Sequence, residues 1–135
     1  MKDENTPIAE LRRAVRDLCR EKHWGRDGDQ DPRQVAMAMT VEMSELLENF
    51  QWMEEDEVER LWARKDPERI ARIAEEFADV MMYGLQLTGT LGIDVASELE
   101  KKIEKVRRRG ENYSAEKQRM RDEFEKRATG ETSDQ

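Results

Sequence analysis

Two pairs of acidic residues in this chain of 135 residues have the spacing of one helical turn. Glu42 and Glu45 are three positions apart, and so are Glu76 and Asp79. Residues at i and i+3 are neighbours on one helical face, so each pair would present two carboxylates side by side. Carboxylates that lie so close repel one another and raise each other's pKa unless a cation lies between them.

The donor types predict a hard divalent cation. Carboxylate oxygens without a nearby histidine favour Mg²⁺ or Mn²⁺ over zinc. A di-iron bundle requires Glu-x-x-His on two helices, and the single histidine, His23, is far from both acidic pairs in the sequence. The competing interpretation is a solvated surface, because acidic residues at this spacing are common in a chain with 32 of them. That interpretation suits the acidic run of Glu54, Glu55, Asp56, Glu57 and Glu59.

The elements that must position these pairs are all expected to be helices. Three capping residues each precede a proline suited to the first helical position, in Thr6-Pro7, Asp31-Pro32 and Asp66-Pro67. Gly92 and Gly110 lie where helices should stop, and no alternating strand pattern is present. We expect helices over 7–22, 32–53, 55–64, 67–91, 94–109 and 114–128. The polar segment 25–30 is expected to be a loop able to close over a ligand, and 129–135 a disordered tail.

Apolar stripes on the two helices that carry the acidic pairs predict how the helices pack. The stripes are Val35, Ala36, Met39, Met43, Leu46, Leu47 and Phe50 on one helix, and Ile70, Ile73, Ala74, Phe77, Val80, Met81 and Leu85 on the other. Antiparallel packing of these helices could bring the acidic pairs face to face. Helices 7–22 and 94–109 would complete a four-helix bundle, giving one all-α domain over residues 1–128.

Composition limits the partners. Charged residues make up 41% and hydrophobic residues 36%, so a thin core is expected to be completed by oligomerisation. The net charge of −8 repels a nucleic-acid backbone, so no nucleic-acid partner is expected. No apolar run approaches the ~20 residues that cross a bilayer, so we expect no membrane partner and a cytoplasmic location. Cys19 is the single cysteine, which excludes an intrachain disulfide.

The segments around the acidic pairs resemble a known family. Residues 41–52 read VEMSELLENFQW, and residues 75–80 read EEFADV. They resemble the MazG-like all-α nucleoside triphosphate pyrophosphohydrolases, in particular the short single-domain dCTP pyrophosphatases. The signature of this family is E-x-x-E followed at an interval by E-x-x-D. The resemblance extends from about residue 11 to residue 117.

The resemblance implies both a reaction and an assembly. Mg²⁺ would be held by Glu42, Glu45, Glu76 and Asp79, and water would attack at the α–β phosphate bridge of a nucleoside triphosphate. The products would be a nucleoside monophosphate and pyrophosphate. One glutamate would orient the water, and the sequence does not assign which one does so. The implied assembly is a homodimer or a homotetramer.

Substrate contacts are also implied by the resemblance. Lys102 matches a lysine that contacts phosphate, Tyr83 matches a tyrosine near the substrate, and Trp24 and Trp52 match aromatic residues around the base. The competing interpretation of both tryptophans is packing in a core or an interface.

Several positions depart from the family pattern. Val106 replaces a common asparagine, Arg33 and Gln34 replace a Lys-Asn pair, and Asp31 replaces a histidine. These departures leave the reaction class intact and the substrate open, with a dCTP-like or modified pyrimidine expected.

Two other functions remain open from the residues. A helical dimer could bind nucleotides as a sensor or interaction module without cutting them, which the altered contact positions would suit. A purely structural acidic bundle would show no change in stability when a divalent ion such as Mg²⁺ is added.

Overall fold

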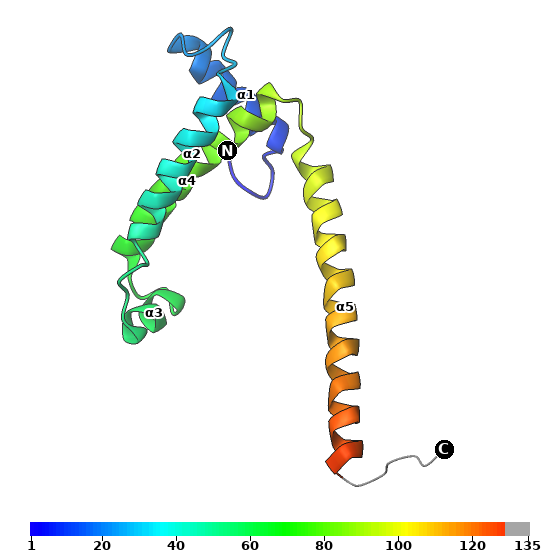
Figure 1. The fold of residues 1–135 in the computed structure, drawn as a ribbon. Coiled ribbons are helices and arrows are strands. Elements are labelled where there is room, and N and C mark those ends of the chain that lie inside the picture. The colour runs from blue at the N-terminus through cyan, green and yellow to red at the C-terminus, as the bar shows by residue number, and fades with distance from the viewer. Residues whose placement is uncertain (129–135) are drawn as a thin grey trace. The chain divides into compact units, whose positions relative to one another are not determined.

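The computed structural model describes the backbone of residues 1–128 and the side chains of residues 1–109 and 115–122. Its elements are α1 (Ile8–Glu21), α2 (Pro32–Glu48), α3 (Glu55–Trp62), α4 (Pro67–Thr90) and α5 (Val95–Ala128) (Figure 1). An isolated bridge between Arg26 and Asp29 is the single β-type pairing of the described residues. The predicted all-α class is confirmed, whereas the tail predicted over 129–135 lies outside the described residues.

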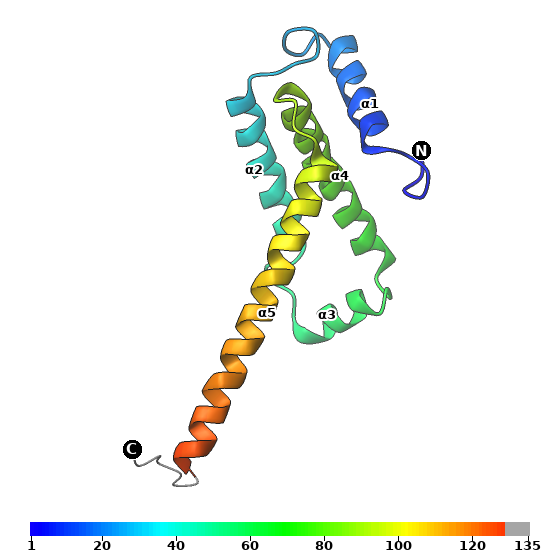
Figure 2. The same cartoon turned by 90° about the vertical axis from the view of Figure 1, so that its right-hand side faces the viewer.

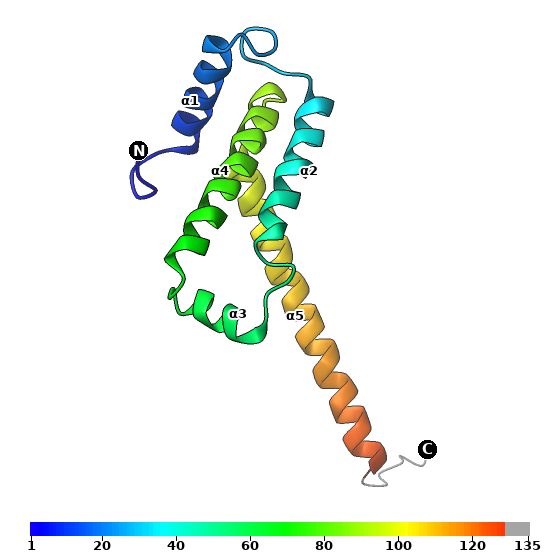
Figure 3. The same cartoon turned by 90° about the vertical axis from the view of Figure 1, so that its left-hand side faces the viewer.

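Residues 1–94 form one compact unit, and the chain from Val95 onward forms a second. In the first unit, α2 and α4 run antiparallel and make the most extensive contact, and α1 packs on α4 (Figures 2 and 3). The short helix α3 joins the end of α2 to the start of α4. Because α5 is a unit of its own, the four-helix core and the single domain over 1–128 stay predictions.

The helix starts follow from capping. The carboxylate of Asp31 accepts a hydrogen bond from the backbone N–H of Arg33 at 2.9 Å, with a proline at the first turn of α2. Asp66 caps α4 in the same way, through the N–H of Arg69 at 3.0 Å. The prediction that Thr6 caps the first helix is wrong, because its hydroxyl accepts instead from the N–H of Lys2 at 2.9 Å.

The predicted break at Gly110 is also wrong, since α5 continues through it as one helix. A glycine inside a helix costs about 1 kcal/mol relative to alanine, and the neighbouring arginines and glutamates are good helix formers that tolerate this cost. The second helix is shorter than predicted and ends at Glu48, ahead of a turn that contains Trp52.

The core of the described chain is thin. Its buried hydrophobic side chains are Cys19, Val35, Val80 and Leu85. Other members of the predicted stripes remain exposed: Met43 and Leu47 on α2, Phe50 just past the end of α2, and Phe77 and Met81 on α4. The described chain therefore leaves apolar surface uncovered on both central helices. None of its helices is both long and apolar enough to cross a bilayer.

Candidate metal centre

Antiparallel packing of α2 and α4 brings three acidic side chains together. Glu42 and Glu45 project from α2 and Glu76 from α4, and each offers a carboxylate oxygen within 4.8 Å of the other two. Glu42 and Glu76 are half-buried, whereas Glu45 is exposed. The structure thus unites three of the four predicted ligands, although Glu76 lies more than thirty positions after Glu42 and Glu45 in the sequence.

Electrostatics supports a cation at this cluster. The pKa of Glu42 is raised by burial, and then by the charges of Glu45 and Asp79. The pKa of Glu76 is raised by burial, and then by Glu45, Asp79, Glu75 and Glu42. Asp79 is not one of the three grouped carboxylates, but its charge acts on the pKa of both half-buried members. A divalent cation would relieve this repulsion, and the all-carboxylate donor set suits a hard ion such as Mg²⁺.

A pocket of about 500 Å³ adjoins the cluster. Glu45 and Glu48 from α2, with Asn49 at the C-terminal cap of that helix, line one part of it. Arg69, Arg72 and Glu76 from α4 line another. The sequence reasoning missed both arginines and Asn49. A signal was present in the spacing, since Arg72 precedes Glu76 by one turn and Asn49 follows Glu45 by one turn.

The predicted substrate residues are distributed around the chain. Trp52 lies just past α2 and is 82% exposed, and Trp24 follows α1 and is 46% exposed. Tyr83 is half-buried on α4, one turn past Asp79, and Lys102 lies on α5 in the second unit. None of these four residues lines the pocket beside the carboxylates. Their roles in substrate binding stay predictions.

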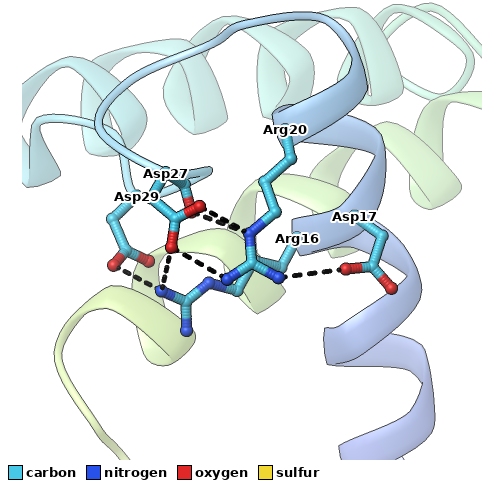
Figure 4. A network of polar contacts seen from close by, with 5 residues as sticks. All are labelled: Arg16, Asp17, Arg20, Asp27 and Asp29. Atoms are coloured by element: carbon cyan, nitrogen blue, oxygen red, sulfur yellow. Dashed lines mark hydrogen bonds and ion pairs between the residues drawn. The ribbon is translucent and has the colours of Figure 1, made fainter.

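The loop after α1 is held to that helix by ion pairs (Figure 4). Arg20 donates from Nε and Nη2 to the two carboxylate oxygens of Asp27, at 3.0 and 2.9 Å, and Nη1 contacts Asp17 at 3.2 Å. Arg16 donates to Asp29 at 2.9 Å. The hydrogen bonds and charge of Arg20 lower the pKa of Asp27. The segment 25–30, expected to close over a ligand, is thus held to α1 through the carboxylates of Asp27 and Asp29.

Comparisons with known proteins show which proteins this chain resembles. A sequence model of the MazG-like family matches residues 37–123, a range that includes all four predicted ligands. The chain is 27% identical to dCTP pyrophosphatase 1 of Bos taurus over 103 residues, which cover 76% of this chain and 58% of that protein. The Homo sapiens protein of the same name is 28% identical with the same coverage. The chain therefore spans 58% of the length of these curated relatives.

A solved structure is similar to this chain as well. The crystal structure of a pyrophosphatase from Archaeoglobus fulgidus matches with a TM-score of 0.65 and 27% identity. The match covers 81% of this chain and 96% of that one. The family resemblance predicted from the two acidic motifs is confirmed.

Proposed function

Since this chain belongs to the MazG-like family, we propose that it is a metal-dependent nucleoside triphosphate pyrophosphohydrolase. It would cut between the α and β phosphates and release a nucleoside monophosphate and pyrophosphate. The observation that carries this proposal is the cluster of Glu42, Glu45 and Glu76, whose carboxylate oxygens lie within 4.8 Å of one another on two facing helices. The names of the similar proteins support the same reaction class.

Mg²⁺ would be held by Glu42, Glu45, Glu76 and Asp79, and Mn²⁺ suits the same donors. When bound, the ion would supply charge neutralisation of the phosphates and a lowered pKa for water. The protein contributes by holding mutually repelling carboxylates in place before any ligand arrives. Glu45 is the exposed member of the cluster and is our choice for the group that orients the attacking water.

The exposed aromatic side chains support a base-binding role. Trp52 and Trp24 are both exposed, so a base could stack on their rings, and stacking is tolerant of base identity. We propose a dCTP-like or modified pyrimidine substrate, with Tyr83 near the nucleotide and Lys102 on a phosphate. Trp52→Ala tests the stacking, with Trp62→Ala as a matched control because Trp62 is equally exposed, at 82%. An increase in KM confined to the Trp52 variant supports stacking, and equal KM values for both variants contradict it.

The uncovered apolar surface on α2 and α4 supports a homodimer or a homotetramer. Burying Met43, Leu47, Phe77 and Met81 against a second copy would remove apolar area from water and complete the thin core. Sedimentation equilibrium would measure the assembly, and a monomer at micromolar concentration would contradict it. In keeping with the net charge of −8, we propose that the chain has no nucleic-acid partner and no membrane partner. We also propose a cytoplasmic location.

The test of function is a panel of ordinary and modified nucleoside triphosphates incubated with Mg²⁺ and analysed for all products. Monophosphate with equimolar pyrophosphate is the expected result, and the ranking of the panel names the base. Diphosphate with phosphate would mean that another bond is cut. If nucleotides bind but no product forms, the chain would be a nucleotide sensor and not an enzyme.

The fourth ligand has its own test. Asp79→Asn should abolish turnover if Asp79 holds the ion, whereas unchanged turnover would restrict the site to the three grouped glutamates.

A further inference from the structure

We propose that Arg72 is a substrate-binding residue, whose guanidinium holds the phosphate chain of the nucleotide in the pocket beside Glu45 and Glu76. This inference rests on the proposed function and adds to it a phosphate contact on α4 itself, distinct from Lys102 on α5. Three observations carry it: the charge of the site, the place of Arg72 in the pocket, and the pairing of its neighbour Arg69.

The negative charge of the site would repel a substrate phosphate unless a positively charged side chain lies beside it. Glu42, Glu45, Glu76 and Asp79 together carry more negative charge than one divalent ion neutralises. Three of these residues, Glu42, Glu45 and Glu76, have carboxylate oxygens within 4.8 Å of one another. A polyphosphate that approaches these carboxylates is therefore repelled unless a positive side chain attracts it.

Arg72 is placed to supply this charge. It lines the same pocket as Glu45 and Glu76, and its residue is exposed to solvent. It precedes Glu76 by one turn, which is the less favourable order for an ion pair along a helix. Arg72 is not among the groups that act on the Glu76 carboxylate. Arg72 makes no hydrogen bond or ion pair with any residue that the structure describes. Its guanidinium is thus available to the two-pronged phosphate contact for which arginine is suited.

The second arginine of the pocket is already engaged. Arg69 donates from Nη2 to Glu57 at 2.8 Å, and its Nε lies 3.5 Å from Asp66. Its side chain is 20% exposed, and it links α3 to the start of α4. Of the two basic side chains in the pocket, Arg72 is accordingly the one free to bind a ligand.

The experiment compares Arg72→Gln and Arg72→Lys with Arg13→Gln, which removes an exposed arginine of α1 outside the pocket. Binding of inorganic tripolyphosphate with Mg²⁺ is measured by titration calorimetry, so no assumption about the base is needed. Arg72→Gln should raise the Kd roughly 10-fold or more, because hydrogen bonds to charged groups are strong. Arg72→Lys should recover part of the affinity, and Arg13→Gln should match the wild type.

Further measurements separate the contact from other roles. In turnover assays Arg72→Gln should raise KM more than it lowers kcat, while the rise in Tm caused by Mg²⁺ alone stays at its wild-type size. Equal Kd values for Arg72→Gln and the wild type would overturn the proposal, even if the wild type hydrolyses triphosphates. A lower ligand-free Tm with unchanged Kd would make Arg72 a packing residue and would also overturn it. Failure of the wild type to bind tripolyphosphate would also overturn the proposal. If the wild type binds tripolyphosphate through Arg72 but hydrolyses no nucleotide, the role of Arg72 is supported and the proposed enzymatic function is contradicted.

Discussion

The side-chain amide of Gln30 donates a 2.7 Å hydrogen bond to Oε1 of Gln86, joining the loop before α2 to the C-terminal part of α4. Gln86 is 7% exposed and is the buried polar side chain of the described core. The same amide lies 3.7 Å from the buried thiol of Cys19 on α1. A single amide therefore connects the loop with two helices of the first unit.

Gln86→Leu should lower the free energy of unfolding by about 1–3 kcal/mol, because the Gln30 amide loses its partner in a part-buried site. Urea denaturation measures this change. The double variant Gln30→Leu/Gln86→Leu should recover much of the loss, since neither amide is then left unpaired. Equal stabilities of the single variant and the wild type would show that the hydrogen bond contributes nothing net.

Glu42→Gln should raise the Tm of the metal-free protein at neutral pH and abolish the further rise caused by Mg²⁺. The reason is that the pKa of Glu42 is raised in the folded state, so its charge opposes folding at pH values above its usual range. Stability associated with this group is present at low pH and is lost as pH rises through the raised pKa. Differential scanning calorimetry with and without Mg²⁺ tests this, with the exposed Glu59→Gln as control. A Mg²⁺ response retained by Glu42→Gln would remove Glu42 from the site.

Asp31 should stabilise the chain above pH 4 and cease to do so as the pH falls towards 2. Hydrogen bonds from the side chain and then the backbone of Arg33 lower the pKa of Asp31 from 3.8 to about 2. A carboxyl group with a lowered pKa contributes stability above its unfolded value and loses it as pH falls through the folded value. Asp31→Asn keeps a capping oxygen but not the charge. Its unfolding free energy should therefore vary less between pH 5 and pH 2 than that of the wild type, and identical pH profiles would contradict the assignment.

Gly28→Ala should be more damaging than Gly92→Ala, although both glycines have positive φ, of 83° and 65°. A Cβ at Gly28 would lie 2.8 Å from the carbonyl oxygen of Arg16, whereas a Cβ at Gly92 meets nothing within 4 Å. Gly92→Ala should cost about 1 kcal/mol from the backbone conformation alone. Gly28→Ala adds a clash with backbone, and chemical denaturation should show the larger loss. Equal losses would mean that the loop moves freely away from α1.

Arg64→Gly should stabilise the chain by about 0.5–1 kcal/mol, because Arg64 ends α3 at a φ of 56° that glycine adopts without strain. The N–H of Lys65 reaches the carbonyl of Arg60 at 2.8 Å, and that of Arg64 reaches Leu61 at 2.9 Å, so the glycine-type helix end is fully formed. Thermal unfolding of this variant measures the gain. A loss of stability would show that the Arg64 side chain makes a larger contribution than its backbone strain.

Helix ends illustrate how far local signals reach. The prediction that a glycine marks the end of a helix was correct for α4 at Gly92, where the N–H of Ile93 donates to the carbonyl of Thr88 at 2.9 Å. The same hydrogen-bond pattern ends α1 at His23 and α3 at Arg64, where no glycine marks it. The rule also predicted a stop at Gly110 inside α5. Helix starts were better predicted, because a capping carboxylate and a following proline act within one turn.

The sequence alone determined the helical class, the capped starts of α2 and α4, and the two acidic pairs, because capping and i, i+3 spacing depend on neighbours within one turn. Tertiary structure decided which carboxylates meet, since distances between Glu42, Glu45 and Glu76 depend on how two helices pack. It also decided that Arg69 is paired whereas Arg72 is not, because the partner Glu57 comes from α3. The apolar stripes predicted more burial than the described chain achieves, since periodicity gives the face of a helix but not what covers it.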